Sequence, residues 1–390
     1  MTMKIKTLST LVLCLLLTST LFGQKIDSLL GVLDTTKNER KVKTLNELFR
    51  ASLQNEPVKA VGYTREALNL ATEINDKKGM AASYNNLGIA YKNQGAFDKS
   101  LDYYMTSLKS YEEIQNKEGI ATTKNNISNI YAVKKDYAQA MKYLEESYNL
   151  FLELDDQTRM IGSMNNLGNL NIEMQQYDKA MNYFSEAYKL AEKRGDKYAD
   201  PLINMGNIFF KQGNYVNAIE HYEKALAMER ANNNKLSVLN IVTNLGIAHA
   251  KGKQSKPAKA YLDEASALCS ELQAYSFLPA IYKAVAENFA NMGDWKLAYE
   301  TEVKYDEARE RIYGEESSRN IAQMEMIVGF QQKEKELDIL KKDDVITKLE
   351  LQKSRLFIIL IILGVLTIIG GLNFFYLSKR KVFKKKLKQN

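Results

Sequence analysis

The chain has little of the residues that interrupt secondary structure or cross-link small domains. Only 4 prolines and 20 glycines occur in 390 residues, and 45% of the residues are apolar. This composition excludes collagen-like, proline-rich and wholly disordered chains, and it favours long helices. Of the 2 cysteines, Cys14 lies in an apolar leader, which leaves Cys269 without a partner for an intramolecular disulfide.

Residues and motifs for catalysis are equally scarce. The 2 histidines, His221 and His249, are too few for a zinc centre of cysteine and histidine ligands, although counting leaves carboxylate metal sites open. The sequence contains no GxxxxGK[ST], GxGxxG, HExxH or GxSxG motif. It therefore predicts a protein that is not an enzyme and has no metal or cofactor.

The formal net charge of +7 does not describe the body of the chain. Seven basic residues lie in the stretch 379–390 and two in the leader, so the remaining residues are nearly neutral. A nearly neutral body has no basic face of the kind that binds nucleic acid, and we expect no nucleic-acid partner.

The amino-terminal residues have the layout of a secretory signal peptide. Residues 1–23 combine a basic start, an apolar run from about Leu8 to Leu17 and a small-residue stretch ending at Gly23. Cleavage would leave a polar segment, residues 24–40, at the mature amino terminus. A lipoprotein is the weaker alternative because Cys14 lies inside the apolar core, and an uncleaved anchor is disfavoured because the run is short for a bilayer.

A second apolar stretch, near the carboxyl end, is long enough to cross a membrane. Residues 356–377 carry no charge and would extend about 33 Å as a helix, which matches the hydrocarbon thickness of a bilayer. Seven basic residues follow it, whereas only Lys353 and Arg355 directly precede it, so the positive-inside rule places the carboxyl end in the cytoplasm. We expect a single-pass protein of a bacterial inner membrane with a periplasmic body and a basic cytoplasmic tail, residues 378–390.

The residues between these ends repeat with a period of about forty. The segment NNLGIAYKNQGAFDKSLDYYMTSL, which starts at Asn85, recurs in diverged form from Asn125, Asn165, Ile203 and Thr243. One position of each unit, called the phase position below, is occupied by Gly88, Ser128, Gly168, Gly206, Gly246 and Ala286. Periods of 20 to 50 residues indicate a solenoid of stacked structural units.

Each unit contains two helical patterns joined by a turn. In the unit quoted above, apolar residues recur every three or four positions over 84–91 and again over 101–108, with Gly95 between them. The glycine at the phase position lets the two helices approach closely. Small residues of the second helix are predicted to lie opposite it: Ser100, Ala140, Ala180, Ala218, Ala258 and Ala298. A single helix pair cannot bury these faces, so neighbouring pairs must stack.

These residues resemble the tetratricopeptide repeat, with its leucine-glycine-tyrosine first helix and alanine-phenylalanine-alanine second helix. The resemblance covers residues 41–305, about seven units, and implies an all-α solenoid of helical hairpins. The first unit lacks the glycine and the last has Ala286 in its place, which is expected of capping repeats. The family resemblance further implies a scaffold that binds peptides or proteins on a concave face lined by the first helices.

Asparagine recurs on the first helices, where it is a poor helix former. We predict that the candidate binding residues on the concave face are Asn86, Asn126, Asn129, Asn166, Asn169, Asn204, Asn207 and Asn244. Their amides would pair with an extended peptide backbone, because an amide offers both donors and acceptors. The alternative is that the amides bond helix backbones within the stack. The row Tyr103, Tyr143, Tyr183 and Tyr261 is interpreted as packing, and His221, which interrupts it, receives no catalytic role.

A charged, proline-free stretch, residues 306–355, connects the repeats to the apolar stretch. Ile321, Met324 and Val328, and later Ile339, Ile346 and Leu349, have partial heptad spacing. The stretch predicts a long helix, either a solvated spacer or a coiled coil that joins two copies of the chain.

The whole layout resembles the sensor half of bacterial membrane histidine kinases and related regulators with periplasmic repeats, without the kinase domain. The leading hypothesis is a non-enzymatic, membrane-anchored scaffold that binds a protein or peptide outside the cytoplasm. One alternative is a receptor whose kinase or DNA-binding output is separate or truncated, and a second is an envelope assembly factor.

Overall fold

The computed structural model describes residues 26–54 and 56–387, and every regular element in this part of the chain is a helix. The internal contacts divide the chain into two compact units, residues 1–320 (unit 1) and 321–390 (unit 2). The predicted signal peptide, residues 1–23, lies outside the described residues. The all-α fold class expected from the sequence is confirmed.

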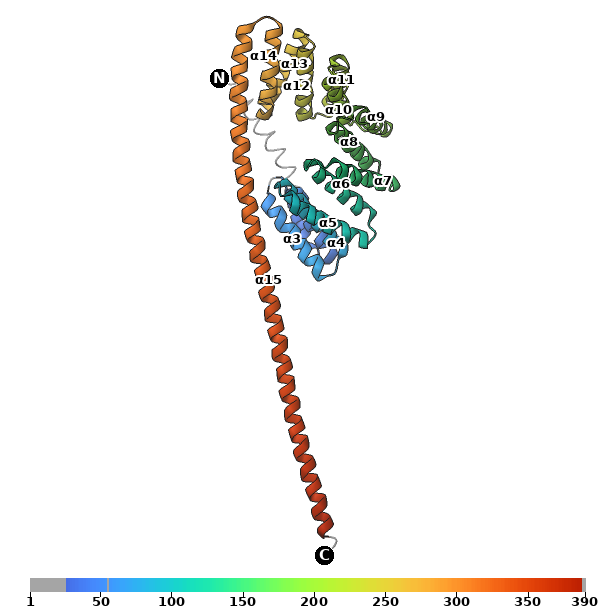
Figure 1. The fold of residues 1–390 in the computed structure, drawn as a ribbon, viewed down its shortest axis with the longest axis vertical. Coiled ribbons are helices and arrows are strands. Elements are labelled where there is room, and N and C mark those ends of the chain that lie inside the picture. Colours follow the sequence, from blue (N-terminus) through green and yellow to red (C-terminus); the bar gives the residue numbers. More distant parts are fainter. Residues whose placement is uncertain (1–25, 55, 388–390) are drawn as a thin grey trace. The chain divides into compact units, whose positions relative to one another are not determined.

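Unit 1 is an array of helix pairs (Figure 1). A helix at 26–35 precedes them. The first helices of the pairs are α2 (Asn38–Ser52), α4 (Lys77–Asn93), α6 (Lys117–Val133), α8 (Gln157–Glu173), α10 (Asp200–Lys211), α12 (Lys235–Lys251) and α14 (Leu278–Asn291). The second helices are α3 (Pro57–Glu73), α5 (Phe97–Glu113), α7 (Tyr137–Glu153), α9 (Tyr177–Arg194), α11 (Tyr215–Ala231), α13 (Ser255–Glu271) and the start of α15 (Trp295–Leu387). Within unit 1 the pairs follow a curved path, with α6 and α8 on its inner side and α7 and α9 on its outer side.

The turns between helices use one residue in the left-handed backbone region. Gly95, Gly213 and Gly293, the turn glycines of three pairs, have φ between 75° and 79°. Lys135, Gln175 and Lys253 take this conformation in the turns of three other pairs, at higher steric cost, and asparagine, aspartate or glutamine takes it in most turns between pairs. Helix starts are capped by side chains as well, since Asp76 accepts a hydrogen bond from Gly79 N and Asn116 accepts one from Gly119 N.

The phase position explains how the two helices of a pair pack. A Cβ at Gly88 or at Gly168 would collide with the ring of Tyr104 or Phe184 from the second helix. The predicted close approach is therefore present, but the side chain that fills it is an aromatic ring four residues beyond the small residue. The small residue also takes part, because Ser100 donates a 2.7 Å hydrogen bond to Gly88 O.

Tyr103, Tyr143 and Tyr261 of the tyrosine row stack on aromatic rings of the first helix of their own pair. Tyr103 stacks on Tyr91 with ring centroids 5.2 Å apart, and Tyr143 stacks on Tyr131 at 5.7 Å. His221 continues the row, because its ring lies 5.1 Å from that of Phe209. These contacts show why an imidazole can replace a tyrosine there.

The last pair carries polar residues where the inner pairs are apolar. The buried position of the inner second helices, which holds Tyr104 and Phe184, is occupied by the exposed Glu302 in α15. The helix that ends the array thus carries an exposed, charged side chain where the inner pairs bury an aromatic ring, and such a change is expected of a capping repeat.

Unit 2 consists of the part of α15 from residue 321 onward. Within it, the stretch Ile346–Phe374 is long and apolar enough to cross a membrane, with a mean hydropathy of 2.6, and its most apolar window is not buried. Ile339, Ile346 and Leu349 of the predicted heptad pattern are exposed. The helix expected over 306–355 is present, while its pairing with a second copy stays a prediction.

Candidate functional site

Asparagines of successive first helices are joined by hydrogen bonds between their side-chain amides. Asn126 Nδ2 donates to Asn85 Oδ1 at 3.0 Å, and the equivalent bonds Asn166–Asn125 and Asn204–Asn165 are both 3.1 Å long. We call these three pairs the amide ladder. In each pair the donor lies two residues before the phase position, and the acceptor lies three residues before the phase position of the preceding unit.

The direction of these bonds fixes which amide atoms remain for a ligand. Because Asn85 and Asn125 accept through their oxygens, their Nδ2 groups keep two donor hydrogens, whereas the Asn165 amide is also hydrogen-bonded to Tyr198. The donating partners Asn126, Asn166 and Asn204 keep Oδ1 as an acceptor. The sequence suggested that the asparagine amides either bind a ligand or bond within the stack. The ladder is compatible with both roles, because the same side chains join neighbouring units and keep further polar atoms.

Asn86 and Asn244, at the two ends of the asparagine row, differ in their hydrogen bonds because the units that precede them differ. Asn86 is fully buried, and its Nδ2 donates at 2.8 Å to Asn46, the asparagine two before the phase position of the first unit. Asn244 has no hydrogen-bond partner among the described residues, because Ile203 occupies the position where an acceptor amide would stand. The amide of Asn86 is therefore used inside the stack, whereas that of Asn244 is not.

The asparagines one position after the phase position, Asn129, Asn169 and Asn207, also differ in their hydrogen bonding. Asn207 Oδ1 accepts a 2.7 Å hydrogen bond from the hydroxyl of Tyr222, whose ring is buried, so Asn207 satisfies a core group. Asn129 is half-buried and Asn169 exposed, and neither amide has a protein partner in the described part of the chain. The amides of Asn129 and Asn169 are thus not used inside the described part of the stack, whereas that of Asn207 is engaged.

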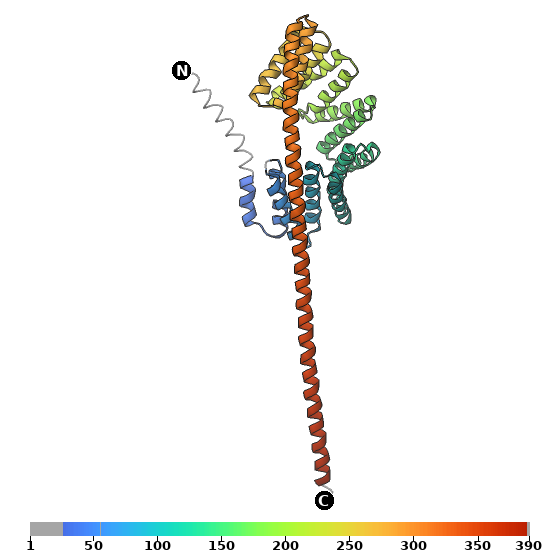
Figure 2. The same ribbon diagram turned by 60° about the vertical axis from the view of Figure 1, so that its left-hand side comes forward.

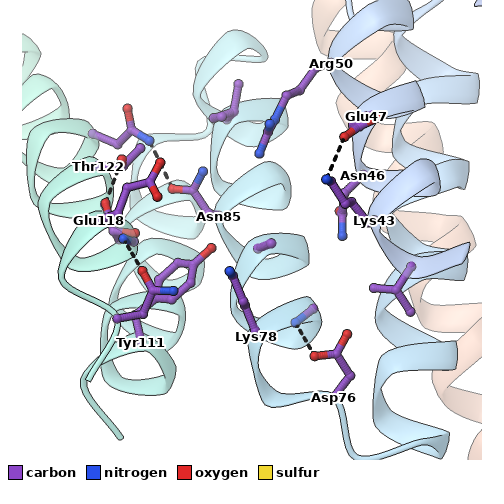
Figure 3. Close-up of a pocket in the computed structure, with 18 of the residues that line it drawn as sticks. Lys43, Asn46, Glu47, Arg50, Asp76, Lys78, Asn85, Tyr111, Glu118 and Thr122 are labelled. Atoms are coloured by element: carbon purple, nitrogen blue, oxygen red, sulfur yellow. Dashed lines mark hydrogen bonds and ion pairs between the residues drawn. The ribbon is translucent and has the colours of Figure 1, made fainter. Parts of the chain in front are cut away.

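A cavity of about 730 Å³ lies on the surface of the first helices of the first three pairs (Figure 3). Asn46, Asn85 and Asn126 line it, together with Ala82 and Thr122. Its size is within the range of pockets that bind small ligands or short peptide segments. Of the predicted site residues, the structure places Asn126 in this cavity and the others elsewhere along the first helices.

Positive and negative side chains occur in equal number around the cavity. They are Lys43, Arg50, Lys78 and Arg159, and Glu39, Glu47, Asp76 and Glu118. Glu118 and Arg159 form an ion pair at 2.7 Å. The Tyr111 hydroxyl also lines the cavity; burial raises its pKa to about 12, with the charge of Arg50 opposing the rise and that of Glu118 adding to it. The hydroxyl is therefore protonated at neutral pH and can donate a hydrogen bond.

Sequence reasoning missed Asn85, Asn125 and Asn165, although the signal was present as the doublets Asn85–Asn86, Asn125–Asn126 and Asn165–Asn166. Periodicity alone selected one member of each doublet. It could not show that the other member accepts the inter-unit hydrogen bond. Among the residues that the structure describes, no group of three or more histidine, cysteine, aspartate or glutamate side chains is arranged to hold a metal ion.

Two models of the tetratricopeptide repeat match this sequence, one at residues 119–193 and 198–271 and the other at residues 80–114. No curated protein matches it significantly. The fold is similar to the apo form of RapI, which is 17% identical over 70% of this chain and 99% of that chain, with a TM-score of 0.55.

Two further solved structures have a similar fold. One is the Signal Transduction ATPase with Numerous Domains protein PH0952 of Pyrococcus horikoshii, which has a tetratricopeptide repeat sensor. It is 17% identical, and the match covers 77% of this chain and 48% of that chain with a TM-score of 0.58. The other is aspartyl phosphate phosphatase F of Bacillus subtilis. It is 15% identical, and the match covers 72% of this chain and 74% of that chain with a TM-score of 0.52. Such low identities concern the fold alone. The family matches and the fold together support tetratricopeptide repeats as the building units of this chain.

Proposed function

We propose that this chain is a non-enzymatic scaffold that binds an extended segment of a protein or peptide along its first helices. The observation that carries the proposal is the amide ladder, which leaves donors on Asn85 and Asn125 and acceptors on Asn126 and Asn166 along the first helices. An extended peptide needs this alternation, because its backbone presents one donor and one acceptor per residue. The unpartnered amides of Asn129 and Asn169 widen the same surface.

Membrane attachment is the second part of the proposal. The apolar stretch Ile346–Phe374 anchors the chain in a bacterial inner membrane, with the repeats in the periplasm and the basic carboxyl end in the cytoplasm. The heptad pattern over residues 321–349, which reaches the start of this stretch, pairs two copies of the chain as a coiled coil. The length and hydropathy of the stretch support the anchor, and the basic residues after it support its orientation.

Site-specific crosslinking tests the binding surface directly. A photoreactive residue would replace Asn129 or Asn169 on the first helices, and Asn149 or Asn182 in the control variants. The controls are exposed asparagines of the same two units that lie on the second helices α7 and α9. In intact cells we expect discrete crosslinked species from the first-helix positions and none from the controls. Equal labelling from both sets would contradict binding along the first helices.

Alanine substitution adds a test that does not depend on crosslinking chemistry. Changing both Asn129 and Asn169 to alanine should weaken the crosslinked complex, because each lost hydrogen bond contributes about 0.5–1.5 kcal/mol. The matched double variant Asn149→Ala/Asn182→Ala should bind as the unmodified chain does. For these measurements, the photoreactive residue would replace Glu173, an exposed residue one helical turn after Asn169 on α8.

A further inference from the structure

The cavity of Figure 3 gathers hydrogen-bond donors from three helices of unit 1. Arg50 comes from α2, Lys78 and Asn85 from α4, and Tyr111 from the end of α5. Figure 3 shows the Arg50 guanidinium and the Lys78 ammonium pointing from opposite sides toward the space beside Asn85, and the Tyr111 hydroxyl pointing toward the same space. The Glu118 carboxylate also lies beside Asn85 in this view, but it is paired with Arg159 at 2.7 Å. The four donors that remain are groups of the kind that bind an anion.

The two cations have no ion-pair partner among the described residues, whereas most carboxylates of the cavity are engaged. Glu118 pairs with Arg159 at 2.7 Å, Asp76 Oδ1 accepts from Gly79 N at 2.9 Å, and Glu47 lies 3.9 Å from Lys43. Glu39 remains, in the first turn of α2, and it is three turns or about 16 Å from Arg50 along that helix. Arg50 and Lys78 are therefore the cations of the cavity that no carboxylate of the described residues pairs with directly.

Asn85 supplies independent evidence for a ligand. It is only 7% exposed, and its Oδ1 is occupied by Asn126, so its Nδ2 is an unpartnered donor of a nearly buried side chain that lines the cavity. Asn85 Nδ2 is thus held in place by the ladder bond and can donate to a group inside the cavity. Ligand oxygen atoms would satisfy it at the point where Arg50 and Lys78 supply charge.

The position of Tyr111 is set by a neighbouring glycine. A Cβ at Gly119 would collide with the Tyr111 ring, so the absence of a side chain there lets the ring lie against α6. The hydroxyl has no hydrogen-bond partner among the described residues and faces the cavity. Tyr111 therefore adds a neutral donor to the two charged ones.

We propose that Arg50, Lys78, Asn85 and Tyr111 form an anion site, which binds a carboxylate or phosphate group of the ligand. This proposal deepens the proposed function, on which it rests, by assigning the chemistry of one ligand group. A carboxylate would come from an acidic side chain or the carboxyl terminus of a peptide, and a phosphate from a phosphorylated one.

The test measures how quickly Lys78 reacts with an amine-acylating reagent in the full chain, purified in detergent micelles. Labelling at each lysine is followed by mass spectrometry in glutarate, inorganic phosphate or chloride at equal ionic strength. We expect glutarate, phosphate or both to slow labelling of Lys78 roughly threefold or more relative to chloride, because the bound anion pairs with the ammonium group. Lys109, on the second helix α5, reports general effects of the salts and should react equally in all three.

Two variants assign the effect to the site. Arg50→Gln and Tyr111→Phe remove one donor each and should reduce the protection of Lys78. Lys43→Gln removes a positive charge from the same cavity without removing a proposed donor, and it should leave the protection intact. A rate at Lys78 that is the same in all three salts, or protection that survives in Arg50→Gln, would overturn the anion site.

The glutarate and phosphate arms distinguish the two sources of the charge. Protection by glutarate alone assigns the site to a carboxylate, and protection by phosphate alone assigns it to a phosphorylated ligand. Because the measurement uses no peptide, a negative result leaves the proposed peptide-binding surface standing. Conversely, failed crosslinking at Asn129 and Asn169 would leave a positive anion result intact.

Discussion

Asn126 and Asn129 lie one helical turn apart on α6, yet only Asn126 is joined to the neighbouring unit. Its Nδ2 donates to Asn85 Oδ1 at 3.0 Å, whereas the amide of Asn129 has no protein partner in the described part of the chain. Two identical residues on one helix face thus have different physical roles. One contributes to the stack, and the other is available to a ligand.

This difference predicts opposite effects of the same substitution. Asn126→Ala leaves Asn85 Oδ1 without its donor and should lower the free energy of unfolding by about 1–3 kcal/mol. Asn129→Ala removes a poor helix former and should leave stability unchanged or raise it slightly. Thermal melting of the two variants measures the difference. Equal melting temperatures would argue against a structural role for the ladder bond.

A second pair of substitutions tests the packing of a helix pair at two glycines of α8. A Cβ at Gly168 would collide with the Phe184 ring, whereas a Cβ at Gly162 meets open space. Gly168→Ala should therefore destabilise the chain by about 1–3 kcal/mol through overpacking. Gly162→Ala should stabilise it by about 0.5–1 kcal/mol, because alanine is the better helix former.

Limited proteolysis shows where the Gly168→Ala effect occurs. Repeats contact mainly their neighbours, so new cleavage should appear first in or beside the pair α8–α9. Uniform cleavage along the whole array would indicate that the loss is not local and would count against this packing of the pair.

The sequence predicted the architecture well because its signals are local and repeated. The period of about forty, the turn glycine Gly95 and the phase glycine Gly88 each depend on a few neighbouring residues. The roles of individual asparagines depend instead on what faces them across the repeat. Asn207 is engaged by Tyr222, and Asn244 is not engaged because Ile203 faces it, and neither fact can be read from spacing within one helix.

The proposed anion site was harder to predict from the sequence than the roles of the asparagines. Arg50, Lys78 and Tyr111 come from three helices of two repeat units, and none of them belongs to a repeated pattern. A repeat analysis detects what is common to all units, whereas a binding pocket is made by residues that differ between them. Such residues become visible only when the helices are placed in space.

The orientation in the membrane can be tested with a reporter that is active only outside the cytoplasm. Fused before Ser354, the reporter should be active, because the signal peptide and the positive-inside rule both place this point in the periplasm. Fused after Asn390, it should be inactive. The opposite pattern would overturn the proposed topology, and activity at neither point would show that the amino-terminal leader does not direct export.

The last prediction concerns a glycine that leaves room on the binding surface. Gly162 lies seven residues before Asn169 on α8, and nothing lies within 4 Å of the position that its Cβ would take. The equivalent residues of the two preceding units, Ala82 and Thr122, line the cavity of Figure 3. A glycine inside a helix costs stability, and here no packing contact requires it. We therefore expect a ligand to approach the backbone of α8 at this point.

Gly162→Leu should fill the space and abolish crosslinking from Asn129 without lowering the melting temperature. Gly62→Leu is the matched control, since Gly62 also lies inside a helix with open space around it, but on the second helix α3. Both variants gain the same helix propensity, so loss of crosslinking in Gly162→Leu alone assigns the effect to occlusion of the first-helix surface. If both variants crosslink like the unmodified chain, the ligand does not pass over Gly162.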